Sequence, residues 1–346
     1  MKEIDLRSDT VTLPTDQMRQ AMLNAVLGDD VFGEDPTINK IQSLAAELTG
    51  KEAGLLVASG TMANLICVLV HCARGEEAIL GDKAHIFLNE AGGISAVGAV
   101  IPHLVPNQDD GTLKLDDIAG AIRGEDSHWP KTRLICLENT HNRCYGAVLT
   151  PEYIDSVGVI AREYGLAVHL DGARIFNAAV ALGKKVREFT RNVDSISFCL
   201  SKGLAAPVGS VVCGTREFIA RAHRSRKVLG GGMRQAGIIA APGIVALEQM
   251  VGRLKEDHRN AQRLAQGISQ IPGLAIDSAR VQTNILYFDL VNDAMKPGEF
   301  QRRMTERGIK FLQTGPSRFR MVTHYGIRPE HIETTLEILN AQMKTA

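Results

Sequence analysis

One lysine interrupts an apolar run in the second half of the chain, and it is the first residue whose chemistry needs an explanation. Lys202 stands in ISFCLSKGLAAPVGSVV, residues 196–212, which contains no acidic residue. Burying an unpaired ammonium group is costly, so a lysine in such surroundings tends to become neutral. A neutral lysine amine is a nucleophile whose commonest reaction is Schiff-base formation with a carbonyl. The alternative is a structural lysine at a strand end whose ammonium group reaches water.

Two further polar residues follow apolar, strand-like runs. Asp171 ends the run in LAVHLDGAR, with Arg174 three positions later, and His85 follows a run in GDKAHIF. Asp171 either pairs with Arg174 or caps a turn, or it faces a pyridine nitrogen and keeps that nitrogen protonated. A lone histidine is more often structural, so His85 gains importance only from its neighbours.

The stretch LLVASGTMANL reads as a strand, a tight turn and the start of a helix. Gly60 permits close backbone approach, and the free amides at the helix start, with the hydroxyl of Thr61, form a suitable phosphate site. The alternative is an ordinary strand-to-helix turn. The stretch matches neither GxGxxG nor a Walker loop, so it gives little support for nucleotide binding.

Together these residues match the needs of one cofactor, pyridoxal phosphate. It requires a Schiff-base lysine, a carboxylate for the ring nitrogen, a phosphate site and a ring that stacks on the cofactor. A nicotinamide enzyme would instead show GxGxxG at the start of its first helix, and this sequence has none there.

The surrounding pattern predicts elements that bring these residues together. Nearly continuous apolar strands alternate with helical patterns, which is typical of a mainly parallel sheet covered on both faces. Ligands of such sheets bind at the carboxyl ends of the strands. Residues 37–49 illustrate the connecting helices: Thr37 is the expected N-cap and Gly50 the expected end.

The character of the sequence changes after GGGMRQAG. A long helical stretch, APGIVALEQMVGRLKEDHRNAQRLAQGI, leads to sparser strand patterns. We therefore expect an α/β protein with two domains. Residues 1–250 would form the large domain, including an N-terminal substrate-binding segment, and residues 251–346 a smaller C-terminal α+β domain that includes the bridging helix.

Composition excludes several classes of protein. Lys+Arg and Asp+Glu both number 39, and this balance argues against a nucleic-acid binder or a polybasic membrane-surface protein. The cysteines form no CxxC pair and no zinc spacing, so we expect no metal site. The N-terminus has no apolar signal core and no apolar run is long enough to span a bilayer, which favours a cytoplasmic protein.

Eight motifs in combination resemble those of the L-threonine aldolases of the low-specificity or L-allo-threonine type. These are pyridoxal-phosphate enzymes of fold type I, the aminotransferase-like group. The motifs are IDLRSDTVTLPT, GDDVFGEDPT, SGTMAN, ENTHN, HLDGAR, LSKGLAAPVGS, KVLGGGMRQAG and RMVTH, and they extend over residues 4–324.

The resemblance implies roles for the residues that bind the cofactor. Lys202 matches the Schiff-base lysine, Asp171 the partner of the ring nitrogen, and His85 the imidazole that stacks on the ring. Gly60 and Thr61 match the phosphate ligands.

The resemblance also implies a substrate site and an assembly. Ser8, Arg174 and Arg320 match the groups that hold the substrate carboxylate. The two arginines suit this role because a planar guanidinium group can donate two hydrogen bonds to one carboxylate. Lys227 and Arg234 match basic residues that reach the cofactor phosphate of a neighbouring subunit. A homodimer or homotetramer with shared active sites is therefore expected.

The implied reaction is the cleavage of a β-hydroxy-α-amino acid to glycine and an aldehyde, with L-threonine and L-allo-threonine both open as substrates. The base for the β-hydroxyl group is His85, His128 or Glu90, in that order of preference, acting directly or through water. His128 matches a histidine near the substrate hydroxyl. Phe32 stands where the family often has tyrosine, which puts any hydroxyl contact there in doubt. A β-eliminating lyase and a pyridoxal-phosphate-binding protein without catalysis stay open as alternatives.

Overall fold

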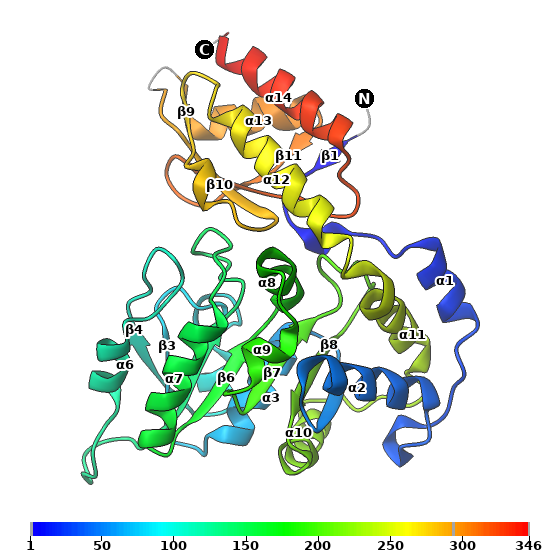
Figure 1. Ribbon diagram of the computed structural model, residues 1–346, viewed down its shortest axis with the longest axis vertical. Coiled ribbons are helices and arrows are strands. Elements are labelled where there is room, and N and C mark those ends of the chain that lie inside the picture. Colours follow the sequence, from blue (N-terminus) through cyan, green and yellow to red (C-terminus); the bar gives the residue numbers. More distant parts are fainter. Residues whose placement is uncertain (1–2, 293–294, 345–346) are drawn as a thin grey trace.

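A seven-stranded sheet forms the centre of the larger lobe in the computed structural model, which describes residues 3–292 and 295–344 (Figure 1). The strand order is β2-β8-β7-β6-β5-β3-β4, and only β8 runs antiparallel to its neighbours. The strands are β2 (Ala53–Val57), β3 (Glu77–Gly81), β4 (Ile101–Val105), β5 (Thr132–Glu138), β6 (Ala167–Asp171), β7 (Ser195–Cys199) and β8 (Ser210–Gly214). The predicted α/β class with a mainly parallel sheet is confirmed.

Helices cover both faces of this sheet. Strand β2 shows why: Leu56 packs into the core with α2 (Pro36–Thr49) and α7 (Pro151–Glu163), while Leu55 and Val57 point into a second core with α3 (Gly60–His71) and α10 (Arg216–Val228). Alternate residues of a strand face opposite sides, so a strand covered twice must be apolar throughout. The remaining helices of this lobe are η1 (Asp9–Val11), α1 (Asp16–Leu23), η2 (Asp30–Phe32), α4 (His85–Leu88), α5 (Gly93–Ala96), α6 (Leu115–Ala121), α8 (Ile175–Leu182), α9 (Val186–Thr190) and α11 (Gly237–Val245).

Helix α2 begins one residue earlier than predicted and has a different cap. The carboxylate of Asp35 accepts hydrogen bonds from the amides of Thr37 and Ile38, and it also accepts bonds from the amides of Gly28 and Gly237. The prediction of Thr37 as N-cap is therefore wrong. Its hydroxyl instead donates to the carbonyl of residue 26.

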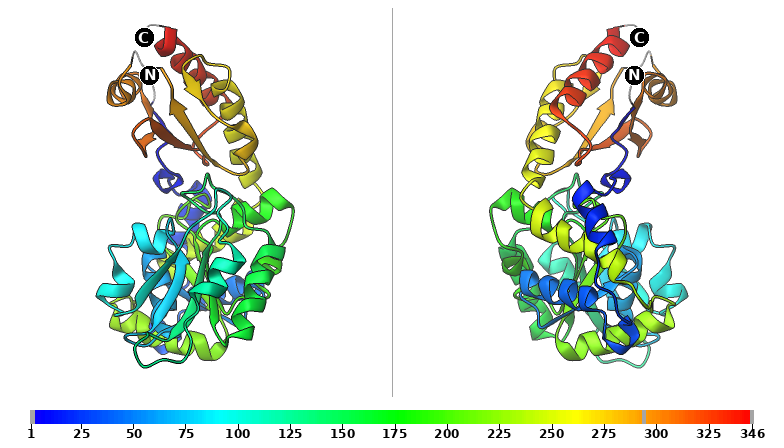
Figure 2. Two further views of the ribbon diagram at one scale, coloured as in Figure 1. Left: turned by 90° about the vertical axis from the view of Figure 1, so that its left-hand side faces the viewer. Right: turned by 90° about the vertical axis from the view of Figure 1, so that its right-hand side faces the viewer.

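The smaller lobe contains an antiparallel sheet of order β12-β13-β10-β9 and stands above the larger one in Figures 1 and 2. Its strands are β9 (Leu274–Ala275), β10 (Ile285–Leu290), β12 (Leu312–Gln313) and β13 (Arg318–Val322), and its helices are α12 (Leu254–Ile268), η4 (Ser278–Arg280), α13 (Pro297–Glu306) and α14 (Pro329–Lys344). The first strand, β1 (Ile4–Asp5), pairs in parallel with β11 (Ile309–Lys310). The prediction placed the N-terminal segment in the large domain, but Ile4 and Leu6 pack into the core of the smaller lobe. The proposed boundary at residue 250 itself stays a prediction.

The predicted bridging helix is bent. Helix α11 continues through the π-helix η3 (Ala246–Met250), and the axis then turns by 68° before α12. No single described helix is long and apolar enough to cross a membrane, although this bent pair meets the limits of length and composition when its two parts are joined. Ala240, Ile244 and Leu247 of the pair are buried in the core of the larger lobe.

Candidate active site

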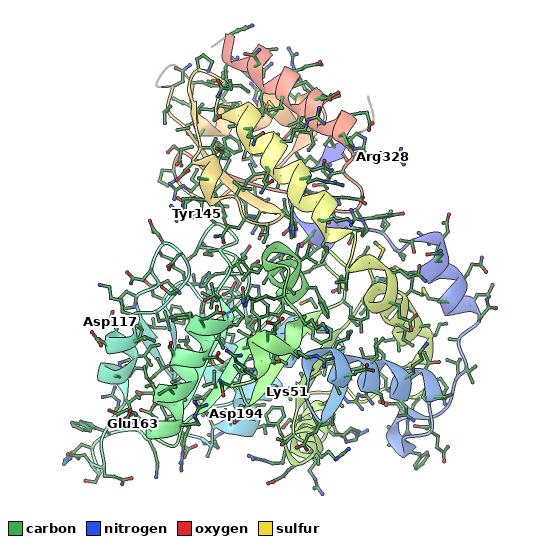
Figure 3. All side chains as sticks on the ribbon, in the orientation of Figure 1. Lys51, Asp117, Tyr145, Glu163, Asp194 and Arg328 are labelled. Atoms are coloured by element: carbon green, nitrogen blue, oxygen red, sulfur yellow. The ribbon has the colours of Figure 1, made fainter. Side chains whose placement is uncertain are left out.

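A cavity of about 740 Å³ lies at the carboxyl ends of the parallel strands, where residues of both lobes meet. Tyr145, labelled between the lobes in Figure 3, lies near this meeting point, and the guanidinium group of Arg280 stacks 3.7 Å from the centre of its ring. The cavity is lined by Ser8, Thr10, Lys83, His85, Leu88, Asn89, Glu138, Asn142, Arg143, Asp171, Ala173, Arg174, Lys202, Tyr287, Leu312, Gln313, Thr314, Arg318 and Arg320. Six of the predicted site residues are among them.

Three parallel strands of the sheet, β6, β7 and β3, position the predicted cofactor residues. Asp171 is the last residue of β6, and Lys202 follows the end of β7, the adjacent parallel strand. His85 begins α4, directly after β3. Because β3, β6 and β7 run in the same direction, their carboxyl ends lie at one edge, and the sequence-based reason for expecting this convergence holds.

Asp171 is buried and does not pair with Arg174. Its Oδ2 accepts a hydrogen bond of 2.8 Å from Nδ2 of Asn64, and its Oδ1 accepts one of 3.1 Å from the amide of Ala173. The carboxylate still lines the cavity. It therefore presents a fixed negative charge to whatever binds there.

Arg174 has a different partner, Asp9. Nε and Nη2 of Arg174 donate to the two oxygens of Asp9 at 2.7 Å each, and both side chains are buried. Burial alone would raise the pKa of Asp9, but the charge and hydrogen bonds of Arg174 outweigh it, and the pKa lies well below its usual value. This bidentate pair holds the guanidinium group in place at the cavity wall.

Ser8 and Arg320 also line the cavity. Ser8 stands at the N-terminal end of η1, and its hydroxyl oxygen accepts a hydrogen bond from the amide of Thr10. Arg320, in β13 of the smaller lobe, donates to Oδ1 of Asn142 and to the carbonyl of Arg7. The N-terminal segment thus reaches the cavity because it crosses from the smaller lobe to the larger one.

His85 forms a dyad with Glu90. Nδ1 of His85 lies 2.7 Å from Oε1 of Glu90, whose side chain is almost fully buried. The hydrogen bond to Glu90 raises the pKa of His85 against the effect of burial, and the charges of Asp171 and Glu138 act in the same direction. Since Nδ1 faces the carboxylate, Nε2 is the ring atom left for proton transfer in the cavity.

The residues present fit pyridoxal phosphate. Gly60 and Thr61 are the first residues of α3, where backbone amides have no acceptor within the helix. They are not in the cavity wall, but a Cβ atom at Gly60 would lie 3.0 Å from Sγ of Cys199, three residues before Lys202. Only glycine allows α3 to start so close to the end of β7. A cradle for an anion, a lysine and a carboxylate thus lie at one edge of the sheet.

A metal ion fits the same place less well. His85, Glu90 and Asp171 have possible ligand atoms within 4.8 Å of one another. However, Nδ2 of Asn64 donates one hydrogen bond to Glu90 and one to Asp171, so an N–H dipole already points at each carboxylate. Both oxygens of Asp171 therefore already accept a hydrogen bond, from Asn64 and from the amide of Ala173, and the three residues make a poor set of metal ligands.

Besides Gly60 and Thr61, three more predicted residues lie outside the cavity wall of their own chain: His128, Lys227 and Arg234. His128 is 87% exposed in the loop before β5, at the amino ends of the strands, and pairs with Asp126. Because β5 is seven residues long, the loop lies a full strand length away from the cavity. The expectation that His128 lies near the substrate is therefore wrong for an active site formed by one chain alone. Lys227, in the last turn of α10, and Arg234, which pairs with Asp29, also lie outside the cavity wall.

Sequence reasoning missed several residues of the site. Glu138 accepts hydrogen bonds from the amides of His85 and Asn142, and so ties α4 to the loop after β5. Asn142 holds Arg320, and the hydroxyl of Tyr287 donates to the carbonyl of Asn142. The position of Glu138 at the end of an apolar strand was a usable signal, the same one that identified Asp171. Asp9 gave no local signal.

Comparisons with known proteins show the family. The model of the beta-eliminating lyase family matches residues 5–291. The chain belongs to that family. It is 46% identical over its whole length to low-specificity L-threonine aldolase 1 of Arabidopsis thaliana, covering 98% of that protein. It is 47% identical to the low specificity L-threonine aldolase of Escherichia coli K12, over 95% of this chain and 96% of the relative.

Solved structures of lower sequence identity share the fold. The structure of Leishmania major threonine aldolase superposes with a TM-score of 0.82 at 20% identity, over 97% of this chain and 98% of the other. A Sphingomonas wittichii serine palmitoyltransferase superposes with a TM-score of 0.78 at 17% identity, over 99% of this chain and 88% of the other. These likenesses confirm the fold expected from the sequence motifs.

Proposed function

We propose that this protein binds pyridoxal phosphate at Lys202 and cleaves L-threonine, L-allo-threonine and related β-hydroxy-α-amino acids to glycine and an aldehyde. The observation that carries the proposal is the convergence of Lys202, Asp171 and His85 on one cavity with Ser8, Arg174 and Arg320. The relatives named as L-threonine aldolases, 46 and 47% identical over nearly the whole chain, support it.

Each group around the cofactor would have a defined task. When bound, pyridoxal phosphate supplies an aldehyde for a lysine amine and an electron-withdrawing ring that stabilises negative charge at the substrate Cα. Asp171, held by Asn64, would keep the ring nitrogen protonated, and the start of α3 at Gly60 and Thr61 would hold the phosphate. His85 would pack against the ring.

The substrate carboxylate would bind to Ser8, Arg174 and Arg320. A carboxylate held by two guanidinium groups fixes the rotation about the substrate N–Cα bond. The bond that breaks is the one held perpendicular to the cofactor ring, so this clamp selects the Cα–Cβ bond. Arg174 can serve this purpose because Asp9 holds its Nε and Nη2, so that its guanidinium group is fixed where the residue lines the cavity.

His85 is the base that we propose for the β-hydroxyl proton. Its Nδ1 faces Glu90, so its Nε2 would accept the proton directly or through a water molecule while Glu90 stabilises the imidazolium form. Glu90 itself is 5% exposed and does not line the cavity, which makes it a partner of His85 rather than a direct base.

The experiment is an assay of the purified protein with all four threonine stereoisomers, measuring glycine, acetaldehyde, ammonia and keto acid. Glycine and acetaldehyde from the L-isomers support the proposal, and ammonia with a keto acid would support the second candidate, β-elimination, which the name of the family suggests. A bound cofactor without turnover would indicate a binding protein. Borohydride reduction should fix the cofactor on the peptide that contains Lys202; a label on Lys227 would contradict the central assignment.

We also propose a homodimer or homotetramer whose subunits share active sites. Arg234 is 57% exposed, paired with Asp29 at the surface, and Lys227 is exposed outside the cavity of its own chain, so a neighbouring subunit would have access to both. The segment of α1 and η2 exposes large apolar side chains, with Phe32 72% and Leu23 77% exposed, as expected of a surface that another subunit covers. His128 would reach substrate only in such an assembly. A cytoplasmic location, without nucleic-acid or membrane partners, is part of the same proposal.

A further inference from the structure

A chain of hydrogen-bonded polar side chains, all buried except the partly exposed His71, runs between α3 and one face of the sheet from Asp171 toward the amino ends of the strands. It runs from Asn64 in α3 to His169 in β6, then to Ser195 at the start of β7 and to His71 at the end of α3. The joining distances are 3.1 Å from Asn64 Oδ1 to His169 Nε2, 2.9 Å from His169 Nδ1 to Ser195 Oγ, and 2.8 Å from Ser195 Oγ to His71 Nε2. No member lines the active-site cavity.

The direction of each hydrogen bond follows from Asn64. Its Nδ2 donates at 2.8 Å to Glu90 and at 2.8 Å to Asp171, and a carboxylate can only accept. Oδ1 of Asn64 must therefore face donors, and it lies 2.8 Å from the hydroxyl of Ser197 and 3.1 Å from Nε2 of His169. A carbonyl oxygen cannot donate, so Nε2 of His169 carries a hydrogen.

The hydroxyl of Ser195, which also lies within hydrogen-bond reach of the thiol of Cys67, links the two histidines. Burial lowers the pKa of His169 to about 4, against the opposing charge of Asp171, so its ring is neutral near pH 7 and Nδ1 accepts from the hydroxyl of Ser195. Burial also lowers the pKa of His71 to about 3, so this ring is neutral as well. Because the single hydroxyl hydrogen of Ser195 points to His169, Oγ can only accept from His71, and Nε2 of His71 is the donor. Every donor in the chain points toward Asp171.

This arrangement of donors and acceptors disfavours the reversed orientation of the Asn64 side-chain amide. If the amide of Asn64 turned over, its oxygen would face two carboxylates, and its NH₂ group would face two N–H or O–H donors. Both ends would be repelled, and Asp171 would lose a hydrogen bond that favours its charged form.

We propose that His169, fixed in its Nε2–H form through Ser195 and His71, is a positioning residue that holds Asn64 as a donor to Asp171. The inference rests on the proposed function only where it assigns Asp171 to the cofactor's ring nitrogen. The chain of hydrogen-bonded side chains ends at a second cavity, of about 460 Å³, at the amino ends of the strands. His71 lines this cavity together with Glu76, Arg133 and Arg221. The far end of the chain of side chains is thus anchored away from the substrate.

The first test uses protein without cofactor, labelled with ¹⁵N-histidine. Long-range ¹⁵N–¹H correlation spectra at pH 7 should show His169 and His71 as neutral rings protonated at Nε2, assigned by signals lost in His169→Gln and His71→Gln. A ring protonated at Nδ1, or at both nitrogens, at His169 would overturn the inference. This measurement does not depend on whether the protein binds a cofactor.

The second test measures binding of pyridoxal phosphate to the cofactor-free protein. His169→Leu should weaken binding by about tenfold or more and move the visible absorbance maximum, because a buried amide loses its donor. His169→Gln, which keeps a donor and an acceptor, should stay within about threefold of wild type. His258→Leu is the matched control, since His258 is likewise buried and bonded to an asparagine, Asn177, that takes no part in the chain.

The outcomes separate the two proposals. Wild-type affinity and spectrum in folded His169→Leu would overturn the positioning role. If that variant does not fold, Ser195→Ala takes its place, because it removes the donor to Nδ1 of His169 with little change in volume. It should show the same spectral change and a His169 signal that is no longer purely Nε2–H. An unchanged signal and affinity would overturn the role. Failure of the wild-type protein to bind pyridoxal phosphate would instead reject the proposed function.

Discussion

Asp9 decides whether Arg174 can act, although it is 165 positions away from it in the sequence. Both side chains are buried, so removal of Asp9 leaves an unpaired guanidinium group in the interior. We expect Asp9→Ala to lower the free energy of unfolding by about 3–5 kcal/mol. Urea denaturation measures this, with Glu306→Ala of the exposed Arg302–Glu306 pair as control, for which the change is below about 0.5 kcal/mol.

The same pair predicts a pH dependence of stability. The pKa of Asp9 in the folded protein lies well below its usual value. Its contribution is therefore complete above the unfolded pKa of about 4 and is lost as the pH falls toward the folded pKa. In urea denaturation between pH 7 and 3, Asp9→Asn should lose less stability than wild type below about pH 4. Equal slopes for the two proteins would contradict the assigned shift.

His85 and Glu90 predict a pH dependence of activity. The hydrogen bond to Glu90 raises the pKa of His85, and a base must be neutral to accept a proton. Glu90→Gln removes the charge, lowers the pKa of His85 toward its usual value and should shift the acid limb of kcat/KM to lower pH. The pH profile of the variant against wild type measures it. A shift to higher pH would exclude His85 as the base.

At the scale of the element, Asp35 has the role that the sequence pattern gave to Thr37. Asp35 caps α2 and also accepts hydrogen bonds from the amides of Gly28 and Gly237. Residue 237 must be glycine for this contact, because a Cβ atom there would lie 2.5 Å from Oδ1 of Asp35. Asp35→Ala should therefore lower the free energy of unfolding by about 2 kcal/mol or more. Thr37→Val, the matched control, loses one bond at the helix surface and should change it by about 1 kcal/mol or less. Reversed magnitudes in urea denaturation would restore Thr37 as the cap.

Element types were largely predictable. Residues 134–137 of β5 form a continuous apolar run because helices cover both faces of the sheet, and β6 and β7 are as deeply buried although His169, Ser195 and Ser197 interrupt their apolar residues. The bend between η3 and α12 was missed because the apolar pattern continues through it; the break falls at residues 251–253, which include Gly252, and α11 before it packs against α1 and α2.

At the scale of the whole molecule, the question is whether Arg234 serves its own site or that of a neighbour. Lys202→Ala and Arg234→Ala are each expected to be inactive. If sites are shared, a mixed dimer has one site with both residues intact, and an equal mixture after subunit exchange should regain about a quarter of the wild-type activity. An assay of the mixture measures this, and exchange is verified with differently tagged chains.

The control mixes Lys202→Ala with Asp171→Ala. Both residues line the cavity of one chain, so no mixed dimer contains an intact site and no activity should return. Verified exchange without recovery in the Lys202→Ala and Arg234→Ala mixture would assign Arg234 to its own chain.

The sequence by itself determined the α/β class, the positions of Lys202, Asp171 and His85 after strands, and the motifs that identify the family. These are local signals, because side-chain periodicity and turn residues are read within one element. Only the tertiary structure decided the partner of Arg174, the place of β1 in the smaller lobe and the separation of His128 from its own cavity. These depend on contacts between segments far apart in the chain, and no local pattern encodes which buried charge meets which.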